Sequence, residues 1–274
     1  MGIFAPCKAV RLDAPGPGGE AIAFNYEDME EDSDGELSSD SQPQPERLYQ
    51  YFPDYDVAIC SCAKCGSTTV MKFIYKTIFG HEWNYPNSPW VQEVSSRWKG
   101  KMISINASRL REVKTTFALR RDPKDRLVSA WKSKVACNPT KWGTDVQESK
   151  DLIADLYSKA YGGRKAVPEC LHFKEFLKAI QRVHEHKAAT YLNHHFKPQN
   201  YICFQDMKPS NWTRVDEVDA HGFAATVARA FGDNTTTWWG HEHASTHKGY
   251  MSISKGEKEL LYNVTKTEYK LLRE

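Results

Sequence analysis

The sequence lacks any long apolar run, which bears first on whether the chain inserts into a membrane. No stretch of its 274 residues approaches the roughly 20 apolar residues of a membrane-spanning helix. The N-terminal segment also lacks the apolar core of a secretory signal. We therefore expect no membrane span, and the missing signal leaves a cytoplasmic location open. Four Asn-x-Ser/Thr sequons point instead to a secretory lumen: Asn106, Asn211, Asn234 and Asn263.

A zinc-binding pattern is missing as well. Cys60, Cys62 and Cys65 lie close together, but neither a second C-x-x-C nor a pair of histidines at zinc-finger spacing accompanies them. We interpret these three as small buried thiols around a loop and expect no bound metal. The chain has seven cysteines, so at least one thiol has no intramolecular partner. In an oxidising compartment three others could include a disulfide: Cys137, Cys170 and Cys203.

Charge is distributed unevenly along the chain, although the net charge is only +2. Residues 1–46 carry 11 of the 35 acidic and 2 of the 37 basic side chains, which leaves residues 47–274 with a net charge of +11. The first segment is also rich in Gly, Pro and Ser and has little to bury. We predict a disordered acidic tail over residues 1–49 and one basic domain over residues 50–274. A basic domain favours anionic partners such as nucleotides or acidic glycans.

The nucleotide-triphosphatase loop, G-x-x-x-x-G-K-[ST], is absent, although a related layout is present. Val57–Cys60 is a short apolar run that predicts a buried strand, and a helical pattern begins near residue 70. The small-residue loop between them carries Lys64 and Gly66, with the lysine first, and continues into the hydroxyl residues Ser67–Thr69. A strand, such a loop and a helix N-terminus direct backbone N–H groups at a phosphate-like anion. The alternative is an ordinary turn with a solvated lysine.

A second strand-to-helix unit begins with the apolar run Thr115–Leu119, which we interpret as another buried strand. Asp122–Pro123 supplies a helix N-cap and a proline suited to the first helical position, so we expect a helix to about residue 134. Arg121 stands at the end of the strand, and the helix should place Arg126 and Ser129 together on its surface. An arginine at a strand end and a hydroxyl on the next helix can bind a phosphate.

The remaining patterns predict helices over residues 151–161, 172–184, 218–231 and 255–272, a strand over residues 201–204, and a loop over residues 237–250. In an open parallel sheet the ligand lies beyond the carboxyl ends of the strands, where both anion-binding units would place their polar residues. We therefore predict an α/β fold with a P-loop-like parallel β-sheet flanked by helices.

These segments resemble the signatures of sulfotransferases that use 3′-phosphoadenosine-5′-phosphosulfate (PAPS). Residues 63–69, AKCGSTT, resemble the P-K-x-G-[ST]-T loop, although Ala63 replaces the usual proline. Residues 121–131, RDPKDRLVSAW, resemble the second signature, R-D-P-x-x-R-L-x-S-x-[YFW]. Residues 195–199, HFKPQ, with Cys203 just after them, are similar to the H-W-x-P-Q…C stretch of Golgi carbohydrate sulfotransferases of the chondroitin and dermatan group. The resemblance covers roughly residues 55–272, and it favours the Golgi lumen.

The resemblance implies a sulfotransferase fold and a role for each matched residue. Lys64 would stabilise charge on the phosphate that leaves when the sulfuryl group is transferred. Arg121 and Ser129 would hold the 3′-phosphate of PAPS, and Lys248 resembles the lysine of a late loop that closes over the cofactor. No metal is required. The 5′-phosphate would be held by the first loop: Cys65, Gly66, Ser67, Thr68 and Thr69.

Two residues are candidates for the general base that accepts the proton of the acceptor hydroxyl. Residues 84–93, NYPNSPWVQE, look like the N-Y-P-S-S-x-x-x-E-E stretch of heparan N-sulfotransferase domains, which favours Glu93. His195 is the rival, from its likeness to the H-W-x-P-Q stretch. Each could instead be an ordinary hydrogen-bonded polar residue.

Two other functions fit parts of the sequence. A nucleotide-dependent kinase or phosphatase would use a similar loop, but it requires the lysine in the P-loop position. A non-catalytic binder of acidic glycan or nucleic acid would depend on the basic domain, and its binding would weaken with salt. We favour a PAPS-dependent sulfotransferase that acts on an acceptor with a free hydroxyl, a carbohydrate before a small molecule, and we expect no nucleic acid partner.

Overall fold

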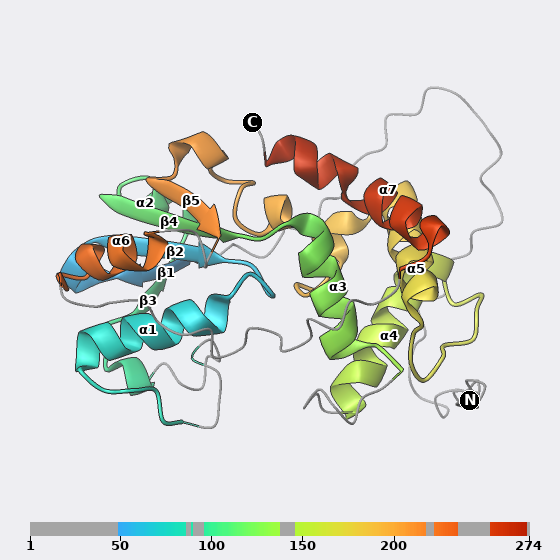
Figure 1. Ribbon diagram of the computed structural model, residues 1–274, viewed down its shortest axis with the longest axis horizontal. Coiled ribbons are helices and arrows are strands. Elements are labelled where there is room, and N and C mark those ends of the chain that lie inside the picture. The colour runs from blue at the N-terminus through green and yellow to red at the C-terminus, as the bar shows by residue number, and fades with distance from the viewer. Residues whose placement is uncertain are drawn as a thin grey trace, which may run out of the picture.

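A computed structural model describes residues 49–85, 89, 96–137, 146–217, 222–234 and 253–272, and the fold is organised around a five-stranded sheet (Figure 1). In sheet order the strands are β3 (Ile103–Ile105), β1 (Tyr49–Phe52), β2 (Val57–Ser61), β4 (Thr115–Arg120) and β5 (Arg214–Glu217). Strands β2, β4 and β5 are parallel, whereas β1 runs antiparallel to both of its neighbours. The predicted α/β fold is confirmed, with an antiparallel edge added to the parallel strands.

Two helices, α1 (Ser67–Phe79) and α6 (Phe223–Ala230), pack on one face of the sheet. Val57 and Ile59 of β2 belong to the buried cluster on this face. Ala58 and Cys60 belong to the cluster on the opposite face, together with Leu110 of the short helix α2 (Ala107–Leu110). Because successive side chains of a strand point to opposite faces, the single apolar run of β2 contributes to both layers.

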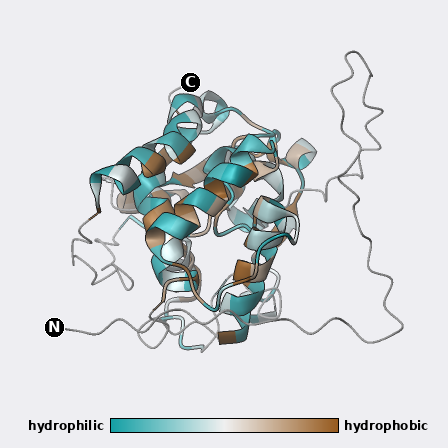
Figure 2. Ribbon diagram, turned by 90° about the vertical axis from the view of Figure 1, so that its right-hand side faces the viewer, coloured by the Kyte–Doolittle hydropathy of each residue, from teal (hydrophilic) through white to brown (hydrophobic). Residues whose placement is uncertain are grey.

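The other helices form a separate group beyond the end of β4 (Figure 1). They are α3 (Pro123–Lys134), α4 (Val146–Tyr161), α5 (Phe173–Glu185) and α7 (Lys255–Leu271), and they share a third buried cluster. Figure 2 looks onto this group and shows hydrophilic and hydrophobic residues alternating along its helices, as amphipathic helices require. No helix within the described ranges is long and apolar enough to cross a membrane.

The helices that follow β2 and β4 begin where local signals predict. α1 starts after Gly66, whose φ of 84° is left-handed and suits a residue without Cβ. α3 starts at Pro123, and the Asp122 side chain caps it by accepting hydrogen bonds from the backbone N–H groups of Lys124 and Asp125. Both strand-to-helix units are therefore present as expected.

Three secondary-structure predictions need correction. The strand expected over residues 201–204 is wrong, because the short 3-10 helix Gln199–Tyr201 and turns occupy this region. Cys203 and Phe204 are buried by packing against the sheet and do not pair within it. The charged strand β5 has no apolar alternation and was not predicted. α4 begins at Val146 and α6 at Phe223, whereas helices were expected from residues 151 and 218; residues 218–221 lie outside the described ranges.

The described cysteines are all oxidised, so the interpretation of Cys60, Cys62 and Cys65 as thiols is wrong. Cys62 pairs with Cys65 inside the loop, and Cys60 pairs with Cys203, 143 positions away in the sequence. The expected disulfide in the second half of the chain is present as Cys137–Cys170. The acidic tail lies outside the described residues, and its division from the domain at residue 50 stays a prediction.

Removing the Cys60–Cys203 disulfide should destabilise the fold more than removing Cys137–Cys170. A bridge restricts the unfolded chain more when it closes a longer loop, and these bridges join residues 143 and 33 positions apart. The chain-entropy model predicts that Cys60→Ala/Cys203→Ala lowers the free energy of unfolding by about 1 kcal/mol more than Cys137→Ala/Cys170→Ala. Denaturant unfolding measures the loss of stability in each variant. Repeating the measurement with all disulfides reduced gives the part of each loss that comes from replacing the cysteine side chains, and this part is subtracted. Equal losses after subtraction would contradict the entropic explanation.

Candidate anion-binding site

The first part of the site is the loop between β2 and α1. Lys64 and Gly66 both have left-handed backbone conformations, with φ of 68° and 84°. This conformation costs a non-glycine residue roughly 1 kcal/mol or more, so the surroundings hold Lys64 in place. Among the described residues no side chain caps the N-terminus of α1, and its first turn contains no acidic residue. The backbone N–H groups of Ser67–Thr69 therefore face a region that favours an anion.

The second part of the site is Arg121, which follows β4 directly. Because β2 and β4 are parallel neighbours, with Ser61 paired to Leu119, both strands end at the same edge of the sheet. The Arg121 Nη1 donates a hydrogen bond of 3.0 Å to the backbone oxygen of Lys64, 57 positions away in the sequence. The structure thus brings the two predicted anion-binding units into contact. This bond uses one of the five N–H donors of the guanidinium.

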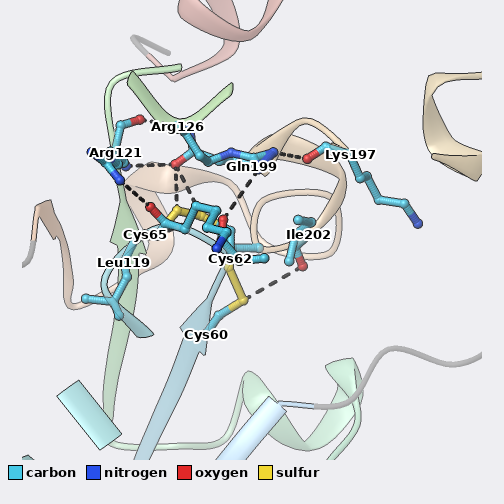
Figure 3. The surroundings of a disulfide bond; sticks show 12 residues. Cys60, Cys62, Cys65, Leu119, Arg121, Arg126, Lys197, Gln199 and Ile202 are labelled. Carbon is cyan, nitrogen blue, oxygen red and sulfur yellow. Dashed lines mark hydrogen bonds between the residues drawn. A yellow bond between two sulfur atoms is a disulfide. The ribbon is translucent and has the colours of Figure 1, made fainter. Parts of the chain in front are cut away.

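Figure 3 shows a buried carboxamide, that of Gln199, between these two units. Its Oε1 accepts from the Arg121 backbone N–H at 2.8 Å, and its Nε2 donates to the Arg121 backbone oxygen at 2.8 Å. A neighbouring strand would make the same pair of bonds, so Gln199 continues the sheet's hydrogen bonding past β4. The sulfur atoms of Cys62 and Cys65 lie 3.5 and 3.4 Å from the same Oε1. Disulfide sulfurs carry no hydrogen, so these are packing contacts.

Arg126 lies behind the loop and supports its backbone. It is 2% exposed, and its guanidinium donates to the backbone oxygens of Ala63, His195 and Lys197. The expectation that Arg126 lies on the helix surface beside Ser129 is therefore wrong, because its guanidinium satisfies backbone oxygens in the interior. Ser129 itself is partly buried on α3. Together, Arg121 and Arg126 engage two successive carbonyl groups of the loop.

Positive charge accumulates around Lys64. The pKa of the Lys64 ammonium is lowered to about 8, chiefly by burial; the cations Lys134 and Arg121 contribute to this shift, and Glu148 opposes it. Glu148 is the partner of Lys134, with Oε1 and Nζ 2.5 Å apart. The local sequence patterns did not identify Lys134 or Glu148 as part of the site, because both come from the ends of helices that meet only in the folded chain.

His195 lies in the same cluster in its neutral form. The pKa of His195 is lowered to about 2, chiefly by burial and additionally by four neighbours: His194, Lys134, Lys64 and Arg126. The His195 Nε2 is 3.9 Å from the Glu148 Oε1, and its Nδ1 is buried without a hydrogen-bond partner among the described residues. A neutral imidazole can accept a proton, but surrounding cations make it a weak base.

A cavity of about 480 Å³ adjoins this cluster at Glu148. Its lining is mostly carboxylates and amides: Gln147, Glu148, Asp151, Leu152, Asp155 and Asn193. Such groups accept hydrogen bonds from hydroxyl donors. The cavity is therefore suited to a polar ligand that carries hydroxyl groups.

Several predicted site residues can be placed and two cannot. Lys64, Cys65, Gly66, Thr68 and Arg121 lie at the carboxyl edge of the parallel strands or at the start of α1. Glu93 and Lys248 lie outside the described residues. Within the described ranges, no three His, Cys, Asp or Glu side chains gather as a metal-binding group.

A family model described as "Sulfotransferase family" matches residues 47–225, which is more than half of the chain. The matched segment contains the loop around Lys64, the strand end at Arg121 and the carboxamide of Gln199. It ends before α7, which begins at Lys255. No curated protein and no solved structure matches the chain.

Anion binding should become weaker as the pH rises through the pKa of Lys64. Only the protonated ammonium attracts an anion, and its pKa of about 8 without ligand lies below the ordinary lysine value of 10.5. Affinity for sulfate, whose charge does not change in this range, should be constant below about pH 8 and fall by up to tenfold per pH unit above it. Titration calorimetry at several pH values measures this. Lys64→Met should remove the pH dependence, and an unchanged profile in that variant would contradict the assignment.

Proposed function

The chain belongs to the sulfotransferase family, and on this premise we propose that it transfers a sulfuryl group from PAPS to a hydroxyl group of a carbohydrate acceptor. The observation that carries the proposal is the 3.0 Å hydrogen bond from Arg121 to the backbone oxygen of Lys64. It joins two anion-binding units at one edge of the sheet. PAPS carries anionic groups at two separate positions of its ribose, so it requires two such units in one site.

The residues at this edge fit a ligand with several negative charges. The lowered pKa of Lys64 reflects burial and cationic neighbours that are only partly balanced by Glu148. An anion beside the ammonium would offset that repulsion in a partly buried environment, where charge interactions are stronger than in water. The N-terminus of α1, which no side chain of the described residues caps, adds N–H donors on the same side.

We assign the two units to the two ends of the nucleotide. Arg121 and Ser129 hold the 3′-phosphate, and Lys248 belongs to a segment that covers the cofactor. PAPS supplies the activated sulfuryl group. The 5′-phosphosulfate is bound by the first loop and the start of α1: Lys64, Cys65, Gly66, Ser67, Thr68 and Thr69.

The protein's contribution to the reaction is positioning and charge stabilisation. The Lys64 ammonium and the N–H groups of Ser67–Thr69 stabilise the negative charge that grows on the departing phosphate. Holding donor and acceptor in line lowers the entropic part of the barrier. The acceptor hydroxyl gives up its proton to a general base, for which His195 and Glu93 are the candidates. His195 is already neutral and lies in the same charged cluster as Lys64.

A carbohydrate acceptor is supported by the cavity beside Glu148. Its carboxylates and amides can accept hydrogen bonds from several sugar hydroxyls. The likeness of residues 195–199 to carbohydrate sulfotransferases supports the same class. The three disulfides and the sequons favour an oxidising secretory compartment such as the Golgi lumen.

Titration calorimetry with adenosine 3′,5′-bisphosphate, the product of sulfuryl transfer, tests the proposal. Wild type should bind it without Mg²⁺, and Arg121→Ala should weaken binding by about 30-fold to 100-fold because a charge-assisted phosphate contact is lost. Lys178→Ala, on the exposed side of α5, is the matched control and should bind like wild type. Labelled PAPS should then transfer label to a neutral glycan or a small alcohol. Binding that requires Mg²⁺, or no binding in wild type, would contradict the proposal.

Single replacements of the two candidate bases distinguish between them. The variant that lacks the base should lose about 10²-fold to 10⁴-fold in kcat, since proton transfer in the transition state contributes on that order. Glu93→Gln and His195→Ala are compared with wild type at saturating PAPS, with the dissociation constant for the bisphosphate as a control for folding. Normal transfer rates in both variants would exclude both residues as the base.

A further inference from the structure

Helix α7 contributes a buried carboxylate to the site, although it lies beyond the matched segment. The carboxylate belongs to Glu268, which is 7% exposed. Its Oε1 accepts from the backbone N–H of Gln199 at 2.8 Å and from the Gln199 Nε2 at 2.7 Å. Gln199 is the residue whose carboxamide is hydrogen-bonded to the main chain of Arg121. Glu268 therefore reaches Arg121 through one intermediate residue.

The Glu268 carboxylate and the main chain of Arg121 together fix which way the Gln199 carboxamide points. An ionised carboxylate can only accept hydrogen bonds, so the NH₂ end of the amide must face Glu268. The oxygen end then faces the backbone N–H of Arg121, as observed. With a glutamine at position 268, whose amide can donate as well as accept, only the main chain of Arg121 would oppose the reversed orientation. The reversed amide would place an NH₂ group against the N–H of Arg121 and break that bond.

Glu268 also supplies a negative charge that acts on the buried Arg126. Burial lowers the pKa of Arg126, the Glu268 carboxylate opposes this shift, and Arg121 adds to it. The hydrogen-bond partners of the Arg126 guanidinium are backbone oxygens, including that of Ala63. A buried cation without a compensating charge is strongly destabilising, so the carboxylate at 268 helps to keep Arg126 against the loop.

The next residue of α7 makes a second connection to the same strand end. The Tyr269 hydroxyl donates a hydrogen bond to the Asp122 Oδ2, while the other oxygen of that carboxylate caps α3. Glu268 thus contacts Gln199, which holds the main chain of Arg121, and Tyr269 contacts the side chain of Asp122, the residue that follows Arg121. The helix is placed to set the position of Arg121.

We propose that Glu268 is a positioning residue of the cofactor site, which acts through Gln199 to place Arg121 for the 3′-phosphate. The inference rests on the proposed use of PAPS. It assigns to α7 a part in cofactor binding beyond packing against α3 and α5. It also specifies which end of the nucleotide should be affected, because Arg121 is assigned to the 3′-phosphate alone.

Glu268→Gln tests the proposal, since it removes the charge and keeps the shape. Titration calorimetry compares adenosine 3′,5′-bisphosphate with 5′-AMP, which lacks the 3′-phosphate. Glu268→Gln should weaken bisphosphate binding about tenfold and AMP binding less than about threefold. Glu259→Gln, an exposed residue of the same helix, is the matched control and should change neither. In an Arg121→Ala background, Glu268→Gln should have little further effect, because the two residues act as one unit.

The outcomes separate this proposal from the proposed function. If wild type binds neither nucleotide, the assignment of PAPS fails. If wild type binds the bisphosphate but Glu268→Gln weakens both nucleotides equally, or neither, Glu268 has only a structural role and the inference is wrong. If Glu268→Gln does not fold, the same comparison is made with Glu268→Asp, which keeps the charge on a shorter side chain. It should again weaken the bisphosphate more than AMP, and an equal loss for both would overturn the proposal.

Discussion

The candidate site depends on the pair of hydrogen bonds that joins the Gln199 carboxamide to the main chain of Arg121. Strand β4 ends at Arg120, and Gln199 hydrogen-bonds both the backbone N–H and the backbone oxygen of the next residue, Arg121. Gln199 supplies a peptide-like group at this position, so Arg121 leaves the sheet in a defined direction. Because the same carboxamide packs against the Cys62–Cys65 disulfide, the strand end and the loop around Lys64 are held by one buried group.

Around this support the protein concentrates positive charge. The cations of the site are held by neutral carbonyl groups more than by carboxylates: Arg121 binds the oxygen of Lys64, and Arg126 binds three backbone oxygens. Carbonyl partners satisfy N–H donors without neutralising the charge. The edge of the sheet therefore stays positive, with Glu148 and Glu268 as partial compensation. A folded state that tolerates this repulsion gains stability when an anion binds.

Local signals in the sequence predicted β2, β4 and the helices that follow them, whereas strands β1, β3 and β5 were not predicted. Asp122–Pro123 fixed the start of α3, because a cap and its N–H donors lie within three residues. The apolar run over residues 201–204 indicates burial. Such a run looks the same whether the segment pairs within a sheet or packs against the face of a sheet. Cys203 and Cys60 form a pair that no spacing reveals, since seven cysteines allow many pairings. Gln199 and Glu268 are 69 positions apart, and their hydrogen bonds depend on how α7 docks.

The low basicity of His195 has a consequence for the order of events in the proposed reaction. Its pKa is lowered by burial and by four neighbours, of which Lys134, Lys64 and Arg126 are cations. A bound anion would screen these charges and raise the affinity of the imidazole for a proton. If His195 is the base, it gains strength only when the cofactor is in place. An acceptor that entered first would meet a weak base, so the charge that binds the nucleotide would also delay proton transfer until the sulfuryl donor is present.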